Sequence, residues 1–491
     1  MTVTYTDKAK ADVALLDSLC NKEVFVSGGA IRDLLLSRPV IDIDLVVPQD
    51  AVTIATQLAK DIDGTLVSLD EDNGIYRVVS RDGRYFDFSQ YRDGAKAIDE
   101  DLRYRDFTIN ALALRWQDFL SGDITKLIDP TNGLHDIKKG IIRACAKDSF
   151  HKDPLRILRA YRFLVELGFE IEPTTLTYLL ECQGKGRLDE VAKERINYEI
   201  TRIFETNIAW KAINKMAELK TLLILFPELE IAQGVEQPGF HHLDVFGHSL
   251  ETLKMVEKVI ESPHTFFKHS ETVRAWLKEN KQRIIALKWA ALFHDIGKPV
   301  VKGQKGERVT FYNHDREGAL ILKGISRRFR WSRSLEEIVL KLVALHMRPF
   351  HLLNDLRRGG PSSRALRRLL NATGQDYVGL FLLSMADTLA GSGPLKPPEL
   401  EEEIATLFDH VHTFWTETLR PIRSKERIIT GKDVMNILGI PQGPLVGRAL
   451  DALEQAQCDG LVKDRTSSIA FLKKWIKNQG NAPRSSFSQS K

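Results

Sequence analysis

Residues 24–48, VFVSGGAIRDLLLSRPVIDIDLVVP, constrain the fold more than any other stretch of the chain. The run VFVS predicts a short buried strand that breaks into a helix at Gly28 and Gly29, where glycine lets backbone amides approach a phosphate without a Cβ in the way. The run IDIDLVV predicts a second strand with Asp42 and Asp44 on one face. Two such carboxylates repel each other unless a cation lies between them, and Mg²⁺ suits oxygen ligands. The stretch therefore predicts a triphosphate site beside a metal site.

This order of strand, Gly-Gly, helix and D-x-D strand resembles the nucleotidyltransferase superfamily related to DNA polymerase β. Within GGAIRD, Arg32 and Asp33 match the branch that contains tRNA CCA-adding enzymes and bacterial poly(A) polymerases. The resemblance implies that both residues lie on the first helical turn and face the nucleotide. Apolar spacing predicts a helix over 50–61, and GTLVSLD, YRVVS and RYFDFSQ predict strands that complete a small mixed sheet. Asp87, on the third of these strands, would supply a third catalytic carboxylate.

Two further stretches resemble nucleotide-binding motifs of the same branch. DEDLRYRDFTINALAL, residues 99–114, matches the signature D-L-x-R-R-D-F-T-I-N-A-x-A, although Tyr104 stands where the family has its first arginine. The stretch KDPLRILRAYRFLVELGFEI predicts the start of a long helix, with Asp153 and Arg156 one turn apart on one face. It resembles the E-D-x-x-R motif that chooses between CTP and ATP, with Lys152 in place of the glutamate. The nucleotide-binding residues implied by these two motifs are Arg105, Asp106, Asn110, Asp153, Arg156 and Arg159.

A second constellation follows Gln237 and resembles the HD phosphohydrolase family through its H…HD…D spacing. Imidazoles and carboxylates suit a divalent metal, which can lower the pKa of a bound water. The expected metal ligands are His248, His294, Asp295 and Asp387, with His314 and His346 as residues that extend the site or bind a phosphate. Arginine-rich helices at 326–333 and 356–370, with Phe329 and Trp331 interleaved, would suit an RNA backbone.

The predicted fold class is α+β. A polymerase-β-like head with a small mixed sheet is followed by an all-α remainder. The expected domains are the head at 1–145, a helical neck with the base-selecting helix at 146–235, the HD domain at 236–395, a helical RNA-binding tail at 396–480 and a disordered end at 481–491. Residues 1–23 are expected to form a short amphipathic helix.

Composition excludes some classes of protein. Four scattered cysteines with no C-x-x-C pair argue against a disulfide framework and a zinc site. The N-terminus lacks an apolar signal core, and the chain has no run of about 18 apolar residues. A cytoplasmic protein without a membrane partner is therefore expected. The net charge of +4 permits an acidic partner without requiring one.

The resemblance implies template-independent addition of C, and perhaps A, to the 3′ end of tRNA from CTP and ATP, with Mg²⁺ in the head and a divalent metal of unknown identity in the HD site. No DNA partner is expected. The connection QYRDGAKAIDE is short, whereas family members that add the terminal A usually carry a longer basic loop there. CC-adding and full CCA-adding remain open. The alternatives are an HD hydrolase of RNA 3′-phosphates or 2′,3′-cyclic phosphates, a bacterial poly(A) polymerase, and a non-catalytic RNA-binding protein.

Overall fold

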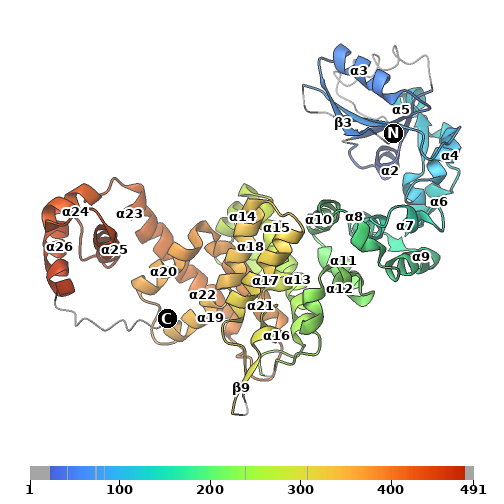
Figure 1. Cartoon of the computed structure of the whole chain (residues 1–491). Helices are drawn as coiled ribbons and strands as arrows, with labels where there is room; N and C mark the ends of the chain where they lie inside the picture. The colour runs from blue at the N-terminus through green and yellow to red at the C-terminus, as the bar shows by residue number, and fades with distance from the viewer. Residues whose placement is uncertain are drawn as a thin grey trace, which may run out of the picture. The chain divides into compact units, whose positions relative to one another are not determined.

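The computed structural model describes residues 23–480 apart from 41, 72, 73, 82, 84, 238 and 307. A helix was expected within 1–23, and all of these residues except Glu23 lie outside the described residues. The disordered end expected at 481–491 also lies outside them. The chain divides into two compact units, Met1–Leu225 and Phe226–Lys491 (Figure 1). No described helix is both long enough and apolar enough to span a bilayer.

Unit 1 begins with a six-stranded mixed sheet in the order β3-β4-β5-β2-β1-β6. Its strands are β1 (Phe25–Ser27), β2 (Ile43–Val47), β3 (Thr65–Asp70), β4 (Ile75–Val79), β5 (Tyr85–Gln90) and β6 (Ala113–Arg115). In the described sheet β2 and β5 pair in parallel, and the other four pairs of neighbouring strands are antiparallel. Val26, Leu45 and Phe88 are fully buried, because the apolar runs of the central strands form the core.

Short helices complete the head and confirm most of the predicted elements. They are α2 (Gly29–Leu35), α3 (Ala51–Asp61), α4 (Ile98–Arg103), α5 (Trp116–Ser121) and α6 (Gly133–Lys139), with a 3₁₀ turn at Thr108–Asn110. The helix predicted at 50–61 and the three strands after it are confirmed. β2 begins at Ile43, so exposed Asp42 directly precedes the strand.

The rest of unit 1 is helical, with one small parallel pair of strands. Its elements are β7 (Ile141–Ile142), α7 (Ser149–Lys152), α8 (Arg156–Leu167), β8 (Glu170–Ile171), α9 (Pro173–Gln183), α10 (Lys193–Phe204), α11 (Ala209–Glu218) and α12 (Thr221–Leu225). The single long helix predicted from Lys152 is wrong. Asp153 is extended, with φ −141° and ψ 98°, because Pro154 disfavours helical geometry in the residue before it. Asp153 and Arg156 therefore do not share one helix face.

Unit 2 is almost entirely helical, which confirms the predicted all-α remainder. Its elements are α13 (Val245–Glu261), α14 (Ser270–Glu279), α15 (Gln282–Phe293), α16 (Lys298–Val301), β9 (Gly303–Lys305), β10 (Arg308–Thr310), α17 (His314–Arg328), α18 (Arg333–Leu345), α19 (Arg348–Leu356), α20 (Ser363–Thr373), α21 (Tyr377–Ala390), α22 (Leu400–Thr413), a π-helical turn (Phe414–Leu419), α23 (Arg420–Ser424), α24 (Gly431–Leu438), α25 (Pro444–Cys458) and α26 (Arg465–Gly480). Helices α24 to α26 share an apolar core of their own, centred on Val434, Leu453 and Leu472.

The aromatic residues predicted to interleave with RNA-binding arginines belong to the core of unit 2. Phe329 and Trp331 are 1% and 8% exposed and pack against Phe226 and Trp289. The arginines are also engaged with protein, since Arg367 forms ion pairs with acidic residues of α25. The prediction that these aromatic residues face RNA is wrong, because the connection between α17 and α18 places both rings in the apolar core.

Candidate functional site

The carboxylates predicted on neighbouring strands of unit 1 lie side by side. β2 and β5 are parallel, and their register places Asp44 directly opposite Asp87. Burial raises the pKa of Asp44; the positive charge of Arg105 opposes this, and the negative charges of Asp87 and Asp42 add to it. The strand pair and the residue before β2 thus bring three acidic side chains close enough to repel one another.

Arginines near this cluster favour the charged form of Asp44, but burial outweighs them. Arg77 of β4 donates to both oxygens of Asp87, each at 2.7 Å. Arg105 is the largest opposing influence on Asp44. The donor set is entirely carboxylate oxygen, which is the ligand chemistry that Mg²⁺ prefers. Asp42, Asp44 and Asp87 therefore fit a hard divalent cation.

The turn between β1 and α2 leaves no room for a side chain beside these carboxylates. Gly28 has φ +72°, and a Cβ there would lie 2.8 Å from Nη1 of Arg105 and 2.9 Å from Oδ2 of Asp44. Arg105 donates from Nη2 to the hydroxyl of Ser27 at 2.6 Å, and burial lowers its pKa to about 10. The glycine therefore lets the backbone pass directly against a buried guanidinium and a carboxylate.

Asp106 forms the centre of a buried network behind this turn. Its Oδ2 accepts from Nε and Nη2 of Arg159 at 2.8 and 2.6 Å, and its Oδ1 accepts from Asn110 at 3.0 Å. Arg32 donates to Asn110 at 2.8 Å and also pairs with Asp33. Burial by itself would raise the pKa of Asp106, but Arg159 and Asn110 outweigh it and hold the pKa well below the usual range. These predicted residues thus meet, and in the structure they bind one another.

Replacing Asp106 with asparagine is expected to destabilise unit 1 by about 3 kcal/mol at pH 7, because the partly buried guanidinium of Arg159 loses its main partner, a buried carboxylate. Since the folded-state pKa of Asp106 is depressed, its contribution is present above the unfolded pKa near 4 and is lost as pH falls. The difference from wild type should therefore shrink below pH 4. Denaturant-dependent hydrogen exchange of peptides covering 99–114 measures it, with exposed Asp99→Asn as the control. If the variant lost as much stability below pH 4 as at pH 7, this account would be contradicted.

The two predicted base-reading residues point to different partners. Arg156 donates to the carbonyl oxygens of Tyr104 and Arg105 at 2.9 and 3.3 Å. Asp153 pairs with Arg195 of α10 at 2.9 Å. Lys152, which replaces the family glutamate, lies over the ring of Tyr104, with its Nζ 4.6 Å from the ring centroid. The two positions that depart from the family motifs thus touch each other.

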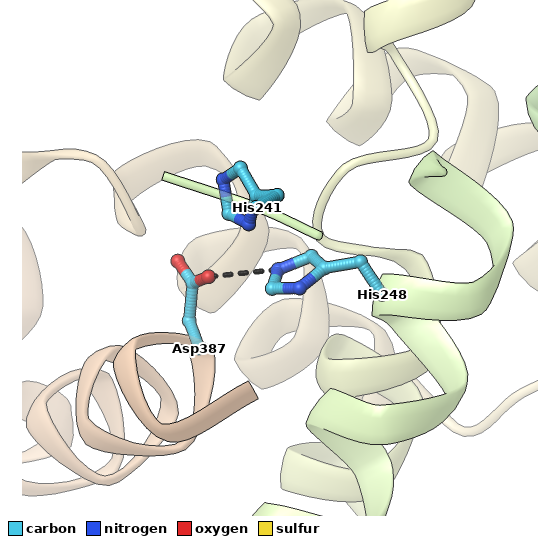
Figure 2. A group of neighbouring side chains, drawn as sticks. All are labelled: His241, His248 and Asp387. Atoms are coloured by element: carbon cyan, nitrogen blue, oxygen red, sulfur yellow. Dashed lines mark hydrogen bonds and ion pairs between the residues drawn. The ribbon is translucent and has the colours of Figure 1, made fainter. Parts of the chain in front are cut away.

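The predicted metal ligands of unit 2 converge from separate helices. His248 lies on α13, His294 and Asp295 follow α15, and Asp387 lies on α21. Nε2 of His248 is 2.9 Å from Oδ1 of Asp387, and Nε2 of His294 is 3.2 Å from Oδ2 of Asp295. Figure 2 shows the His248 and Asp387 side chains facing each other, with His241 beside them. We call the whole group the histidine centre; its members are His241, His248, His294, Asp295, His314, His346 and Asp387.

The other histidines extend the histidine centre, one of them unforeseen. Nε2 of His314 and of His346 are 3.0 Å apart and lie 3.3 and 3.6 Å from Oδ1 of Asp295. His241 was not predicted, yet its ring centroid lies 4.3 Å from that of His248 and it shares a potential ligand group with Asp387. The HH pair in GFHHLDVFGH was the available sequence signal. Burial, and then His248, lowers the pKa of His241 to about 3, so it is a neutral donor near pH 7.

Unpaired buried atoms indicate that the histidine centre fits a divalent metal. Nδ1 of His241 and Nδ1 of His248 are buried without a hydrogen-bond partner, and Nε2 of His294 faces only carboxylate oxygens, with Oδ2 of Asp295 at 3.2 Å. Burial would raise the pKa of Asp295, but His294 and Lys298 outweigh it and hold it well below the usual range. Imidazole nitrogens suit transition metals, and ionised carboxylates suit hard divalent cations such as Mg²⁺ and Mn²⁺, so the mixed donor set fits a divalent metal.

Three family models match separate parts of the chain. The Poly A polymerase head domain matches 24–143, the HD domain matches 245–413, and the probable RNA and SrmB-binding site of polymerase A matches 168–232. The first match contains the carboxylates of the sheet, and the second contains the histidine centre apart from His241.

Similar curated proteins and solved structures extend over almost the whole chain. An A-adding tRNA nucleotidyltransferase of Deinococcus radiodurans is 30% identical over 91% of this chain and 94% of its own length. A CC-adding tRNA nucleotidyltransferase of Geobacter sulfurreducens is 31% identical over 91% and 90%. A Thermotoga maritima CCA-adding enzyme complexed with tRNA superposes with a TM-score of 0.62 at 23% identity, covering 96% of both chains.

Proposed function

The chain belongs to the tRNA nucleotidyltransferase family, and we propose that its first unit adds nucleotides from CTP to the 3′ end of tRNA without a template. The observation that supports this proposal is the register of Asp44 with Asp87 beside Gly28 and Arg105. It brings paired carboxylates next to a turn that a side chain would block. Such a place suits a nucleotide triphosphate and a divalent ion.

The proposed roles follow from what each side chain contacts. Asp42, Asp44 and Asp87 would hold Mg²⁺, which when bound lowers the pKa of an RNA 3′-hydroxyl and neutralises phosphate charge. Gly28 and Gly29 leave the backbone open to the phosphates. Arg105 supplies a fixed positive charge beside them.

The buried network would fix the nucleotide's surroundings without moving. Arg32, Asp33, Asp106, Asn110 and Arg159 already bind one another, so their positions are set before a nucleotide arrives. Asp153 would read the base because it keeps a single ion pair, with half-exposed Arg195, and an exposed pair contributes little stability. Arg156 donates to the carbonyl oxygens of Tyr104 and Arg105, and it would therefore hold the backbone of these two residues in place beside the base.

We propose that addition ends after two cytidines. The segment 91–97 between β5 and α4 is short, and it is also anchored: Arg92 donates from its backbone and its guanidinium to fully buried Asp101, at 2.9 to 3.2 Å. The resemblance assigns a longer flexible loop here to enzymes that add the terminal A. A short tethered segment does not supply such a loop. The curated relatives include both A-adding and CC-adding enzymes, so the end point needs a direct test.

A tRNA transcript ending at the discriminator base, offered CTP, ATP or both with Mg²⁺, is expected to grow by two cytidines and stop. Addition of ATP should not extend it. Gel analysis at single-nucleotide resolution measures the result, with the Asp44→Asn variant as the blank. Growth only of a transcript that already ends in CC would instead indicate an A-adding enzyme. Growth to CCA would overturn the argument from the anchored segment, and long A tracts would indicate a poly(A) polymerase.

A second candidate function is metal-dependent hydrolysis of a 3′-phosphate or 2′,3′-cyclic phosphate at an RNA end. The observation that favours it is the set of buried, unpaired imidazole nitrogens in the histidine centre. A bound divalent metal would supply an activated water there.

Replacing His294 with alanine is expected to remove the metal of the histidine centre and to lower hydrolysis more than about a hundredfold, because several kcal/mol of stabilisation depend on the metal. Metal content by mass spectrometry and phosphate release measure the two effects. His264→Ala, an exposed histidine of the same unit, is the control. Nucleotide incorporation should persist in both variants. Unchanged metal content in the His294 variant would contradict the assignment.

A further inference from the structure

A small hairpin joins α16, whose Lys298 contacts Asp295 of the histidine centre, to α17, which begins at His314 of the same centre. β9 and β10 pair in antiparallel register, Lys305 opposite Arg308, and the pair projects from the helices beside α16 (Figure 1). Lys302, Lys305 and Arg308 are all exposed. Neither an apolar face nor a second sheet layer accounts for the hairpin, because Gly303, Gln304 and Lys305 are exposed along the whole of β9.

The charges on this hairpin oppose its formation. Like charges directly opposite each other on antiparallel strands are destabilising, and a two-stranded ribbon is marginally stable by itself. The ion pairs of the described residues include none to Lys305 or Arg308, and Glu307 lies outside the described residues. A bound anion that contacts both cations would remove the repulsion.

The hairpin begins and ends at the histidine centre. Lys298, at the start of α16, has its Nζ 2.6 Å from Oδ2 of Asp295. His314, at the start of α17, has its Nε2 3.3 Å from Oδ1 of the same carboxylate. Each strand has three residues, which extend about 10 Å. The cations of the hairpin therefore lie within the length of a few nucleotides of the centre.

Exposed aromatic side chains flank the same centre. Tyr312 is 67% exposed and lies two residues before His314; Phe240 is 46% exposed and directly precedes His241. Exposed rings and exposed cations around one site are the combination that binds single-stranded nucleic acid, because the rings stack on bases while the cations contact phosphates. An acidic protein would use the cations but would gain little from the rings.

We propose that the hairpin 302–310, with Tyr312 and Phe240, binds single-stranded RNA and presents its 3′-terminal phosphate to the histidine centre. This inference rests on the proposed metal site and names its substrate class: a strand end rather than a free nucleotide. Lys302, Lys305 and Arg308 contact the backbone, and the two rings hold the terminal bases.

The test uses the full chain and a fluorescent 12-nucleotide single-stranded RNA with a 3′-phosphate and a terminal 4-thiouridine. Anisotropy gives the affinity, and photocrosslinking with peptide mass spectrometry gives the site. The variants are Lys302→Ala/Lys305→Ala/Arg308→Ala and Tyr312→Ala. The charge-matched control is Lys268→Ala/Lys278→Ala/Lys281→Ala, three exposed lysines around α14.

Wild type is expected to crosslink within 300–316, and both hairpin variants should lose that crosslink and bind at least about tenfold more weakly. The triple variant should flatten the slope of log affinity against log salt by about 2, since each phosphate contact contributes about 0.7 on a single strand. Control variants should match wild type. Crosslinks confined to unit 1 would overturn the inference. It would also be overturned if poly-L-glutamate displaced the RNA equally well from wild type and from Tyr312→Ala, because the site would then bind acidic chains through its cations alone. Hydrolysis by the histidine centre without a hairpin crosslink would overturn it too while leaving the hydrolase proposal intact.

Discussion

Asp44→Asn is expected to reduce nucleotide incorporation about a thousandfold or more while leaving unit 1 folded. Asparagine keeps the shape of the side chain and removes the charge that would bind Mg²⁺ opposite Asp87. Several kcal/mol of phosphate stabilisation would be lost with the ion, and each 1.4 kcal/mol corresponds to a factor of ten in rate. Incorporation of labelled CTP into a tRNA transcript measures the loss.

The stability of the same variant distinguishes a site residue from a structural one. Burial, together with the charges of Asp87 and Asp42, disfavours the charged form of Asp44 more than Arg105 and Arg92 favour it. Its neutral replacement should therefore leave the metal-free unit as stable as wild type or slightly more stable. Asp61→Asn, an exposed carboxylate on α3 of the same unit, is the matched control and should change neither quantity. Incorporation within tenfold of wild type would reject the assignment of the metal to this strand pair.

Local motifs predicted the residues whose meeting depends on local geometry. Gly28 and Asp44 belong to one continuous stretch in which strand, turn and strand follow each other, so their approach could be foreseen. Asp87 could be foreseen because a third strand of the right pattern follows. The four predicted ligands of the histidine centre, His248, His294, Asp295 and Asp387, were found by the same means, since they occur in short recognisable runs.

Residues whose environment depends on distant parts of the chain were not predicted correctly. His241 enters the histidine centre because Asp244 caps α13 and holds the preceding loop through the amide of Gly234. Arg367 finds Asp451 and Glu454 more than eighty positions later in the chain. A sequence shows that arginine carries a charge, but it does not show which helix will neutralise that charge.

The break at Pro154 was readable from the sequence, but the apolar periodicity of the residues after it favoured a longer helix.

Gly28→Ala is expected to reduce incorporation about a hundredfold or more, for a reason that differs from loss of a ligand. The substitution keeps every charge but places a methyl group within 3 Å of both Arg105 and Asp44, neither of which can move freely: Arg105 is fixed to Ser27, and Asp44 lies on a central strand. Since φ at this position is +72°, the backbone is strained as well, which costs about 1–3 kcal/mol.

A second glycine separates the strain from the collision. Gly374, which follows α20, has φ +59° and ψ −135°, close to the φ +72° and ψ −133° of Gly28, but no atom lies within 4 Å of its Cβ position. Gly374→Ala therefore carries a similar backbone penalty of about 1–3 kcal/mol and no clash. Thermal unfolding and CTP incorporation should show that Gly374→Ala loses stability alone, whereas Gly28→Ala loses activity well beyond its stability change. If the two variants behave alike, the close approach of Gly28 to Arg105 and Asp44 has no role in binding the nucleotide, because backbone strain alone would then account for both results.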